Sequence, residues 1–353
     1  MARVLHIVAA DTSPDMMAQA RLLAGDGDRI VSAGPAAAVT APVGAVTPIH
    51  GPFDSVRLSG LAMRKLAAGA DVIHTWSPAA ASAAQQATKK TARAVLISLG
   101  HLPPPAELDG LLSGLFDRRW AITISTESDR HRLALIGAPV DRLFVLPPAT
   151  EPIHAAPQRR QHVRKALQLR QADFLLVAPS QMTRHAGHKY AAWAHAMARI
   201  FLPQVRLAFP TRGPAEQSVR TFVKTTGYDR EVFFTWRRFA LPDVLAAADA
   251  ALFLHRRNCG AAALAAAMAA GLATVAWDCT DLADCAPHDQ AALLSPRGNV
   301  RAATAHVVRL ADEADLRRRL ASNAAARARE RFSLPGVRRQ LVRIYSDLAP
   351  CRS

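Results

Sequence analysis

The sequence predicts an α/β protein in which two doubly wound domains, each a parallel sheet covered by helices, face a common cleft. Short apolar runs alternate with amphipathic segments along both halves of the chain, as parallel strands joined by crossover helices do. A length of 353 residues suggests two domains rather than one. The alternation is interrupted at Glu151–Arg160, where prolines and mixed charge indicate a linker. We therefore expect a first domain at residues 1–154 and a second at residues 155–335.

Strands in the first half are expected where short apolar runs are bounded by turn residues. These runs are Arg3–Ala9, Arg29–Ser32, Asp71–His74, Ala94–Ser98, Ala121–Ser125 and Leu143–Leu146. Helices are expected between them, where apolar residues recur at helical spacing. These segments are Pro14–Ala24, Val56–Ala68, Ser77–Ala87 and Glu127–Leu135. The loop after the first strand has no glycine-rich phosphate fingerprint, so a nucleotide is not expected there.

The pattern restarts after the linker. Strands are expected at Phe174–Ala178, Val205–Phe209, Val232–Phe234, Ala250–Leu254, Ala273–Trp277 and Leu293–Leu294. Helices are expected at Arg164–Leu169, Gly187–Ile200, Ala215–Thr225, Gly260–Ala270, Val300–Ala311, Asp315–Arg331 and Val337–Leu348. Trp76 and Trp193 are expected to pack in the cores, with stacking on a base or sugar as the alternative.

The stretch Leu241–Asp278 indicates where a ligand would bind. It contains an apolar run, a basic loop, an alanine-rich helix that Gly260 opens and Gly271 ends, and a second apolar run. Ligands of parallel sheets bind where carboxyl ends of strands meet helix N-termini. Helix N-termini also favour anions, because unpaired N–H groups and the helix dipole point at them. We therefore expect a phosphate at the loop His255–Gly260.

The net charge of +16 implies an anionic partner, which could be nucleotide phosphates, an acidic membrane surface or nucleic acid. A compositional bias of a GC-rich genome is the alternative explanation. No zinc-finger or RNA-binding signature is present, so no nucleic acid is expected as a partner. The four cysteines lack paired metal-ligand spacing, which predicts reduced thiols and no metal site. The start lacks the layout of a signal peptide and no apolar run reaches membrane-spanning length, so a cytoplasmic protein is expected.

Four segments in order carry a resemblance to a known family. They are DVIHTWSPAAA (71–81), AITISTESDRHRLALIGAPVDRLFVLPPATE (121–151), the stretch 241–278, and DEADLRRRLASNAAARARERFSLPGVRRQLVRIY (312–345). They resemble the family 4-like glycosyltransferases, glycosyl transferases group 1, of the GT-B fold. The resemblance implies two Rossmann-like domains, with a C-terminal helix (336–353) that completes the first, acceptor-side domain.

The resemblance further implies transfer of a sugar from a nucleotide-sugar donor (a UDP-, GDP- or ADP-sugar) to an acceptor, with retention and without an obligatory cofactor or metal. The nucleotide would bind to the second domain. The acceptor would be a sugar, a lipid-linked molecule or a small molecule, and a peripheral site at the anionic inner face of the membrane is a further expectation. Positive groups would stabilise the charge that develops on the departing diphosphate.

Four positions depart from the family pattern. Asn258 and Ala266 stand where the family usually has two glutamates, one near the sugar and one at the ribose hydroxyls. Gln181 and Ala186 stand where it usually has the arginine and lysine that hold the diphosphate. These departures motivate a second hypothesis, a catalytically inactive GT-B-fold protein that serves as a binding or scaffold partner.

Basic residues nearby are the candidates for a shifted diphosphate site, since guanidinium groups bind phosphate in a bidentate manner. They are Arg184, His185, His188 and Lys189 after one strand, and Arg256 and Arg257 after another. Asn258, as a sugar contact, and Gly260, at the start of the next helix, complete the expected donor site. Among them, Arg184 and Lys189 are expected to act in catalysis. The alternatives are a solvated basic loop for each group and a helix cap for Asn258.

Outside these two loops, His101 follows the strand at residues 94–98, at a place where the family often has a histidine near the sugar. It is therefore the third catalytic candidate, with a structural role as the alternative, as for His74. Arg317–Arg319 and Arg327–Arg331 are expected to be solvated helix faces, with membrane contact as the alternative.

Overall fold

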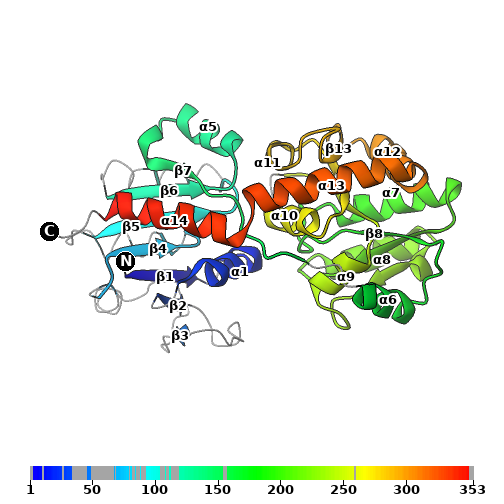
Figure 1. Cartoon of the computed structure of the whole chain (residues 1–353), viewed down its shortest axis with the longest axis horizontal. Coiled ribbons are helices and arrows are strands. Elements are labelled where there is room, and N and C mark those ends of the chain that lie inside the picture. The colour runs from blue at the N-terminus through cyan, green and yellow to red at the C-terminus, as the bar shows by residue number, and fades with distance from the viewer. Residues whose placement is uncertain are drawn as a thin grey trace. The chain divides into compact units, whose positions relative to one another are not determined.

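The computed structural model of the chain describes residues 3–9, 12–25, 28–33, 46–48, 67, 69–78, 80–81, 84, 88, 93–103, 108, 111–112, 119–153, 157–257 and 260–349. The chain divides into two compact units, the first made of residues 1–149 and 334–353 and the second of residues 150–333 (Figure 1). The predicted helix Val56–Ala68 falls almost wholly outside the described residues.

The first unit is built on a parallel sheet whose described strands run in the order β3-β2-β1-β4-β5-β6-β7. The strands are β1 (Val4–Ala9), β2 (Arg29–Ala33), β3 (Val46–Pro48), β4 (Val72–Thr75), β5 (Ala94–Leu99), β6 (Trp120–Ile124) and β7 (Leu143–Val145). The helices are α1 (Pro14–Leu23), α5 (Glu127–Leu135), the 3₁₀ turn η2 (Val140–Arg142) and α14 (Leu334–Leu348).

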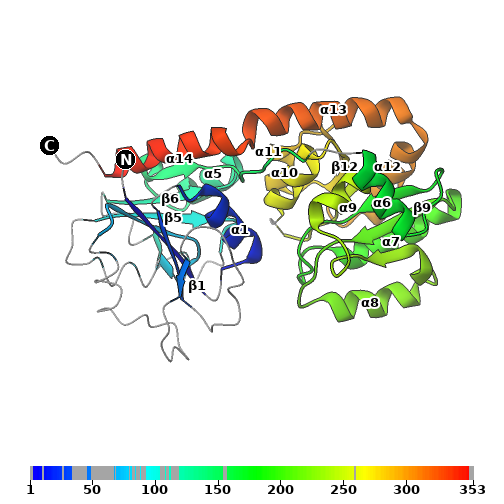
Figure 2. The same ribbon diagram turned by 60° about the horizontal axis from the view of Figure 1, so that its bottom comes forward.

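Both faces of the first sheet are buried, because alternate residues of each strand enter different core clusters. On β5, Leu96 packs in the cluster that contains the apolar side of α14, whereas Val95 and Ile97 pack in the cluster on the opposite face. Helix α14 lies beside α1 over the sheet (Figure 2). The C-terminal helix is thus part of the core of the first unit.

A buried hydrogen-bond chain fixes α14 to this sheet. The Nδ1 atom of His74 lies 2.6 Å from the hydroxyl of Tyr345, and its Nε2 atom lies 2.7 Å from the hydroxyl of Ser98. Trp76 is buried as expected and stacks on the ring of His74, with 4.2 Å between the ring centroids. His74 therefore has a structural role, which was the alternative to a role near the sugar.

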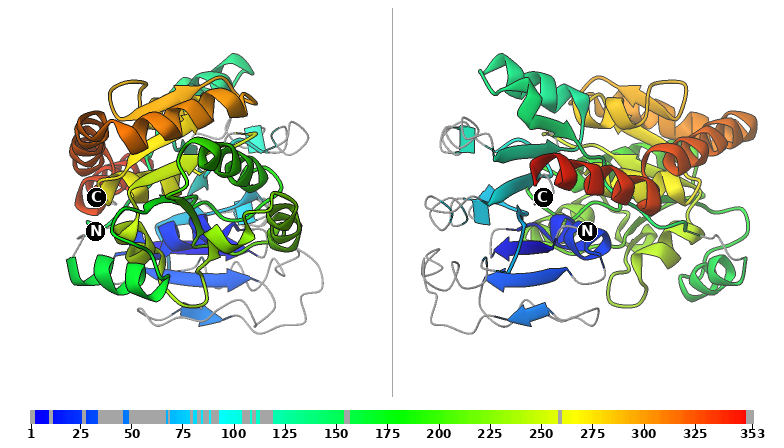
Figure 3. Two further views of the ribbon diagram at one scale, coloured as in Figure 1. Left: turned by 90° about the vertical axis from the view of Figure 1, so that its right-hand side faces the viewer. Right: turned by 60° about the vertical axis from the view of Figure 1, so that its left-hand side comes forward.

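The second unit is built on a parallel sheet whose described strands run in the order β10-β9-β8-β11-β12-β13, with helices on both faces (Figure 3). The strands are β8 (Phe174–Val177), β9 (Val205–Phe209), β10 (Val232–Phe234), β11 (Ala250–Phe253), β12 (Ala273–Trp277) and β13 (Ala292–Ser295). The helices are α6 (Pro157–Ala166), α7 (His188–Phe201), α8 (Glu216–Thr225), η3 (Asp229–Glu231), α9 (Leu241–Ala247), α10 (Ala261–Ala269), α11 (Thr280–Cys285), α12 (Val300–Asp312) and α13 (Ala314–Arg331).

Two sequence-based expectations for the second unit are wrong. Helix α6 begins at Pro157, so the end of the expected linker is helical, in keeping with the preference of proline for the first turn of a helix. Trp193 does not pack in the core, because 49% of its surface is exposed on the outer side of α7.

The arginines of α13 do not simply form a solvated face. Arg327 donates from Nε to the carbonyl oxygen of Cys285 (2.7 Å) and from Nη2 to that of Asp284 (2.9 Å). Arg331 donates to the same Asp284 carbonyl (3.1 Å). These bonds provide donors to carbonyl groups at the end of α11 and attach α13 to that helix. Within the residues described, no helix is both long and apolar enough to cross a membrane.

Candidate anion-binding site

The site is built from two neighbouring loops at one edge of the second sheet. Because the strands are parallel, their carboxyl ends meet at the same edge, which we call the carboxyl edge. Strands β8 and β11 are adjacent in the sheet, with Ala250 paired to Leu176. The loop after β8 (178–187) and the loop after β11 (254–260) therefore lie next to each other, and each leads into a helix.

Buried polar side chains, on the interior side of the exposed arginines, hold the two loops together. The hydroxyl of Ser180 and the Nε2 atom of His255 are 2.8 Å apart, and both residues are buried. The carbonyl of Ser180 can only accept, so His188 donates to it from Nε2 (2.9 Å), as does the hydroxyl of Thr211 (2.5 Å). Ser180 is thus bonded to three other segments, and the loop that follows it starts from a fixed point.

Two glycines allow the loops to approach this closely. Gly187 has a φ of +73°, and a Cβ atom there would lie 1.7 Å from the carbonyl oxygen of Leu254. Gly260 has a φ of +90°, and a Cβ atom there would lie 2.1 Å from Cε1 of the His255 ring. A side chain at Gly187 would push the two loops apart, and one at Gly260 would displace the His255 ring that joins its loop to Ser180. Either would also require a left-handed backbone that only glycine adopts readily.

The basic residues of the two loops are brought together by a backbone hydrogen bond. The amide of Arg256 donates to the carbonyl of His185 over 2.9 Å. This bond places Arg184 and His185 beside Arg256 and Arg257, and the three arginine side chains are exposed. The sequence-based grouping of the two loops therefore corresponds to one surface.

Arg297 joins this group although the sequence analysis did not select it. It follows β13, and its Nη1 atom lies 3.4 Å from the carbonyl oxygen of Arg256. The available signal was its position, since Arg297 is a basic residue just beyond the carboxyl end of a predicted strand. The apolar run at Leu293–Leu294 is short, so it was only a weak indication of a strand with a ligand-binding loop at its end.

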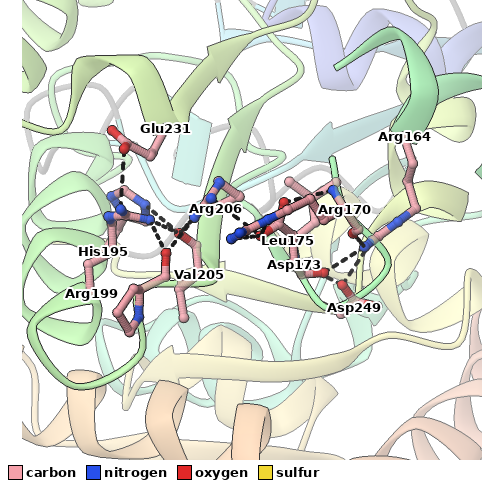
Figure 4. Close-up of polar contacts among 11 residues, drawn as sticks. Arg164, Arg170, Asp173, Leu175, His195, Arg199, Val205, Arg206, Glu231 and Asp249 are labelled. Carbon is pink, nitrogen blue, oxygen red and sulfur yellow. Dashed lines mark hydrogen bonds and ion pairs between the residues drawn. The ribbon is translucent and has the colours of Figure 1, made fainter. Parts of the chain in front are cut away.

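The opposite edge of the sheet has arginines too, but there they are neutralised by carboxylates (Figure 4). Asp249 pairs with Arg160 (2.5 Å) and Arg164 (3.1 Å). Asp173 pairs with Arg170 (3.0 Å) and Arg206 (3.3 Å). Burial alone would raise the pKa of Asp173, but the hydrogen bonds from Arg170 and the charge of Arg206 outweigh it and lower the pKa.

Arg184, Arg256 and Arg297 at the carboxyl edge lack this neutralisation among the described residues. Among the carboxylates that the structure describes, none lies within ion-pair distance of Arg184, Arg256 or Arg297. The pKa of His185 is lowered by its partial burial and by the charges of Arg257, Arg184 and Arg256. The imidazole thus registers an excess of positive charge, and the arrangement is suited to holding an anion by charge-assisted hydrogen bonds.

The other candidates have different surroundings. The ammonium group of Lys189 lies 6.0 Å from the centroid of the Phe222 ring of α8. His101 is exposed in the turn after β5 of the first unit. Asn258 lies outside the described residues. The residue at the N-cap position of α10 is Gly260. In the described ranges, no cluster of three or more His, Cys, Asp or Glu side chains could hold a metal ion.

Helix α10 offers no polar side chain to a ligand. Its nine residues are alanine, leucine and methionine, and Ala266 is only partly buried. Among the described residues, the groups near its N-terminus are therefore backbone N–H groups and the arginines of the adjoining loops. This composition suits recognition of a phosphate by charge and provides no carboxylate that could accept a hydrogen bond from a sugar hydroxyl.

Two parallel α/β units of this kind define the GT-B class of proteins, and comparisons with solved structures agree. The chain superimposes on the Anabaena protein Alr3699/HepE, whose structure was solved in complex with UDP-glucose, with a TM-score of 0.82 and 15% identity, covering 97% of this chain and 99% of that one. Sucrose-phosphate synthase from Thermosynechococcus elongatus gives a TM-score of 0.81 at 15% identity, covering 98% and 99%. An α,α-trehalose 6-phosphate synthase from Burkholderia multivorans gives 0.73 at 15% identity, covering 99% and 97%.

Residues 173–313 match the model of the family described as glycosyl transferases group 1. The chain is therefore a GT-B-fold protein whose second unit carries the glycosyl transferases group 1 domain. The matched segment contains all of the arginines assigned to the carboxyl edge. A comparison with curated protein sequences gives no match.

Proposed function

We propose that the protein is a glycosyltransferase that moves a sugar from a nucleotide-sugar donor to an acceptor, and that the carboxyl edge of the second unit binds the diphosphate of the donor. The observation that carries this proposal is the contrast between the two edges of one sheet. Arginines at one edge are paired with carboxylates, whereas Arg184, Arg256 and Arg297 at the other are not. An anion that binds there would supply the missing negative charge.

Sugar transfer requires this kind of site. The bond between the anomeric carbon and the phosphate oxygen breaks, and negative charge grows on the leaving diphosphate. The acceptor hydroxyl gives up its proton to an oxygen of the departing diphosphate as its own oxygen bonds to the same carbon. In the proposal, Arg184 and Arg256 donate hydrogen bonds to the diphosphate and stabilise the transition state, because they are oriented before the charge develops. A divalent cation is not required, since the guanidinium groups supply the positive charge.

Solved relatives of the same fold support the donor class. The Anabaena protein Alr3699/HepE was crystallised with UDP and with UDP-glucose. The sequence similarity is low, so the sugar and base of the present donor are left to experiment. We keep retention of configuration as the stereochemical proposal and His101 as the candidate contact with the sugar or acceptor on the first unit.

Calorimetric titration with UDP-, GDP- and ADP-sugars tests the proposal. Saturable binding of at least one donor, weakened by added salt, is expected, because the contacts are between exposed charges. Hydrolysis or transfer assays with the donor that binds then test catalysis. Absence of binding with every donor would contradict the glycosyltransferase proposal.

One observation favours a second candidate, a non-catalytic binding protein. Helix α10 carries only apolar side chains, so it offers a ribose no side-chain acceptor. A protein of this kind would bind phosphate-bearing partners without selecting a nucleotide. Binding of inorganic diphosphate as tightly as any nucleotide sugar, with no turnover, would favour this candidate over the enzyme.

A further inference from the structure

His185 is the one titratable side chain within the cationic group of the carboxyl edge whose charge can change near neutral pH. Its carbonyl accepts from the amide of Arg256, which fixes it between the two loops. Arg184 precedes it in the chain, and Arg257 follows Arg256. The backbone of His185 therefore lies between residues that carry guanidinium groups on two elements, and its side chain is only partly buried.

We propose that His185 is neutral in the free protein and takes up a proton when a phosphate ligand binds, so that an imidazolium is added to the arginines that hold the ligand. This inference rests on the proposed function of the same site. It adds to that site one group, the His185 imidazole, whose charge depends on pH. It concerns any phosphate or diphosphate group and does not depend on the base or sugar attached.

The charged groups around the imidazole determine the direction of the effect. Within the described residues, those that act on His185 are Arg257, Arg184 and Arg256, and all three are positive. Below the site, His188 and His255 are buried. The pKa of His188 is lowered to about 4 by burial and by the charge of His255, so His188 is neutral near pH 7. Free His185 thus has only positive charges acting on it, and an imidazolium there is disfavoured.

A bound anion reverses this balance. Two or more negative charges would lie among the same guanidinium groups and would favour the imidazolium. By linkage, a group whose pKa rises on binding makes binding tighter as the pH falls through the pKa of the complex. The gain in affinity levels off below the pKa that His185 has in the free protein, because His185 is then protonated both with and without the ligand.

The test follows the imidazole itself. The pKa of His185 would be measured by histidine-ring NMR in the free protein, with saturating sulfate and with UDP-glucose, because neither anion titrates near neutral pH. The signal is assigned by its loss in His185→Gln. Calorimetry in two buffers of different ionisation enthalpy, each over about pH 6–8, gives the proton uptake on binding.

We expect the pKa of His185 to rise with either anion, and protons to be taken up by the wild type and by the control His131→Gln, whose histidine is exposed on α5. His185→Gln should bind with little or no uptake. If UDP-glucose binds without uptake and without a change in the pKa of His185, the inference is overturned while the proposed function stands. If sulfate raises the pKa of His185 but no nucleotide sugar binds, the proposed function fails while the inference stands. If neither sulfate nor any of the UDP-, GDP- and ADP-sugars binds, both are overturned.

Discussion

The hydroxyl of Ser180 and the Nε2 atom of His255 lie 2.8 Å apart in the interior of the second unit, although the two residues are 75 positions apart in the chain. Each is the anchor of a loop that carries exposed arginines. A hydrogen bond between buried groups is costly to break, because the remaining partner stays desolvated. This contact therefore sets the separation of Arg184 from Arg256, two groups proposed to hold one ligand.

Replacing Ser180 by alanine tests this role. Ser180→Ala leaves Nε2 of His255 without this partner, so we expect the free energy of unfolding to fall by about 1–3 kcal/mol. Donor binding should weaken as well, because the loops are no longer held together. Urea unfolding and calorimetry measure the two effects. Ser218→Ala, at an exposed position on α8, is the control. If Ser180→Ala matched it in stability and affinity, the anchor role would be excluded.

Removal of one arginine at the carboxyl edge should weaken the binding of a nucleotide sugar. A hydrogen bond to a charged group is worth about 1.5–3 kcal/mol, so Arg184→Ala or Arg256→Ala should raise the Kd about tenfold or more. The salt dependence of the Kd should also decrease. Calorimetry at two salt concentrations measures both. Arg301→Ala, on the exposed side of α12, removes the same charge elsewhere and should leave the Kd unchanged. Equal effects of all three variants would show that only net charge matters.

Much of the fold was accessible from the sequence because buried parallel strands are short apolar runs between turn residues. Val205–Phe209 and Ala273–Trp277 were predicted with the bounds that the structure has. Trp193 was misplaced for a physical reason. Helical spacing shows which residues share a face of α7, but it does not show how far the neighbouring helices cover that face.

Part of the candidate site could be predicted from the sequence. Loops at the ends of adjacent strands could be grouped, because parallel topology brings such ends to one edge. The pairing of Ser180 with His255 could not be predicted, since it depends on side chains from segments that are distant in the chain. The same limit hid the neutralisation of arginines at the opposite edge. Arg164 and Arg184 look alike in the sequence, and only the position of Asp249 distinguishes them.

Asp249 should be important for stability and not for ligand binding. It accepts from Arg160, Arg164 and the amide of Leu175 (2.7 Å), so its loss leaves two partly buried guanidinium groups with carbonyl acceptors but without a carboxylate to balance their charge. We expect Asp249→Ala to lower the free energy of unfolding by about 2–4 kcal/mol, near the lower end of the range for breaking a buried ion pair. Asp315→Ala, whose partner Arg318 is exposed, should cost about 0–1 kcal/mol. Urea unfolding compares them. Equal losses would contradict the structural role assigned to Asp249.

The second unit should lose stability at acidic pH through His195. Its Nε2 atom donates to the carbonyl of Val205 (3.3 Å), and burial together with the charge of Arg199 lowers its pKa to about 3. The unfolded chain takes up this proton below about pH 6.5, whereas the folded chain does not. Stability due to His195 is therefore complete above pH 6.5 and is lost as the pH falls towards 3, by about 1.4 kcal/mol per pH unit.

His195→Gln keeps a donor for Val205 and removes the titration. Urea unfolding at several pH values between about 4.5 and 7.5 should show a shallower loss of stability in this variant than in the wild type. His162→Gln, whose histidine is exposed on α6, should follow the wild type. Parallel curves for wild type and His195→Gln would show that His195 is not held neutral.

Two glycines with similar backbone conformation separate the effect of strain from the effect of contact. Gly260 and Gly271 begin and end the α10 region with φ values of +90° and +70°. A Cβ atom at Gly271 would meet nothing within 4 Å, whereas one at Gly260 would meet the ring of His255.

Gly271→Ala should therefore cost only the left-handed strain, about 1–2 kcal/mol. Gly260→Ala carries the same strain and must in addition displace His255 from Ser180. We expect it to be less stable than Gly271→Ala and to lose nucleotide-sugar binding, which Gly271→Ala should retain. Thermal unfolding and calorimetry on both variants measure this difference, and equal binding by the two would show that the position of His255 does not control the site.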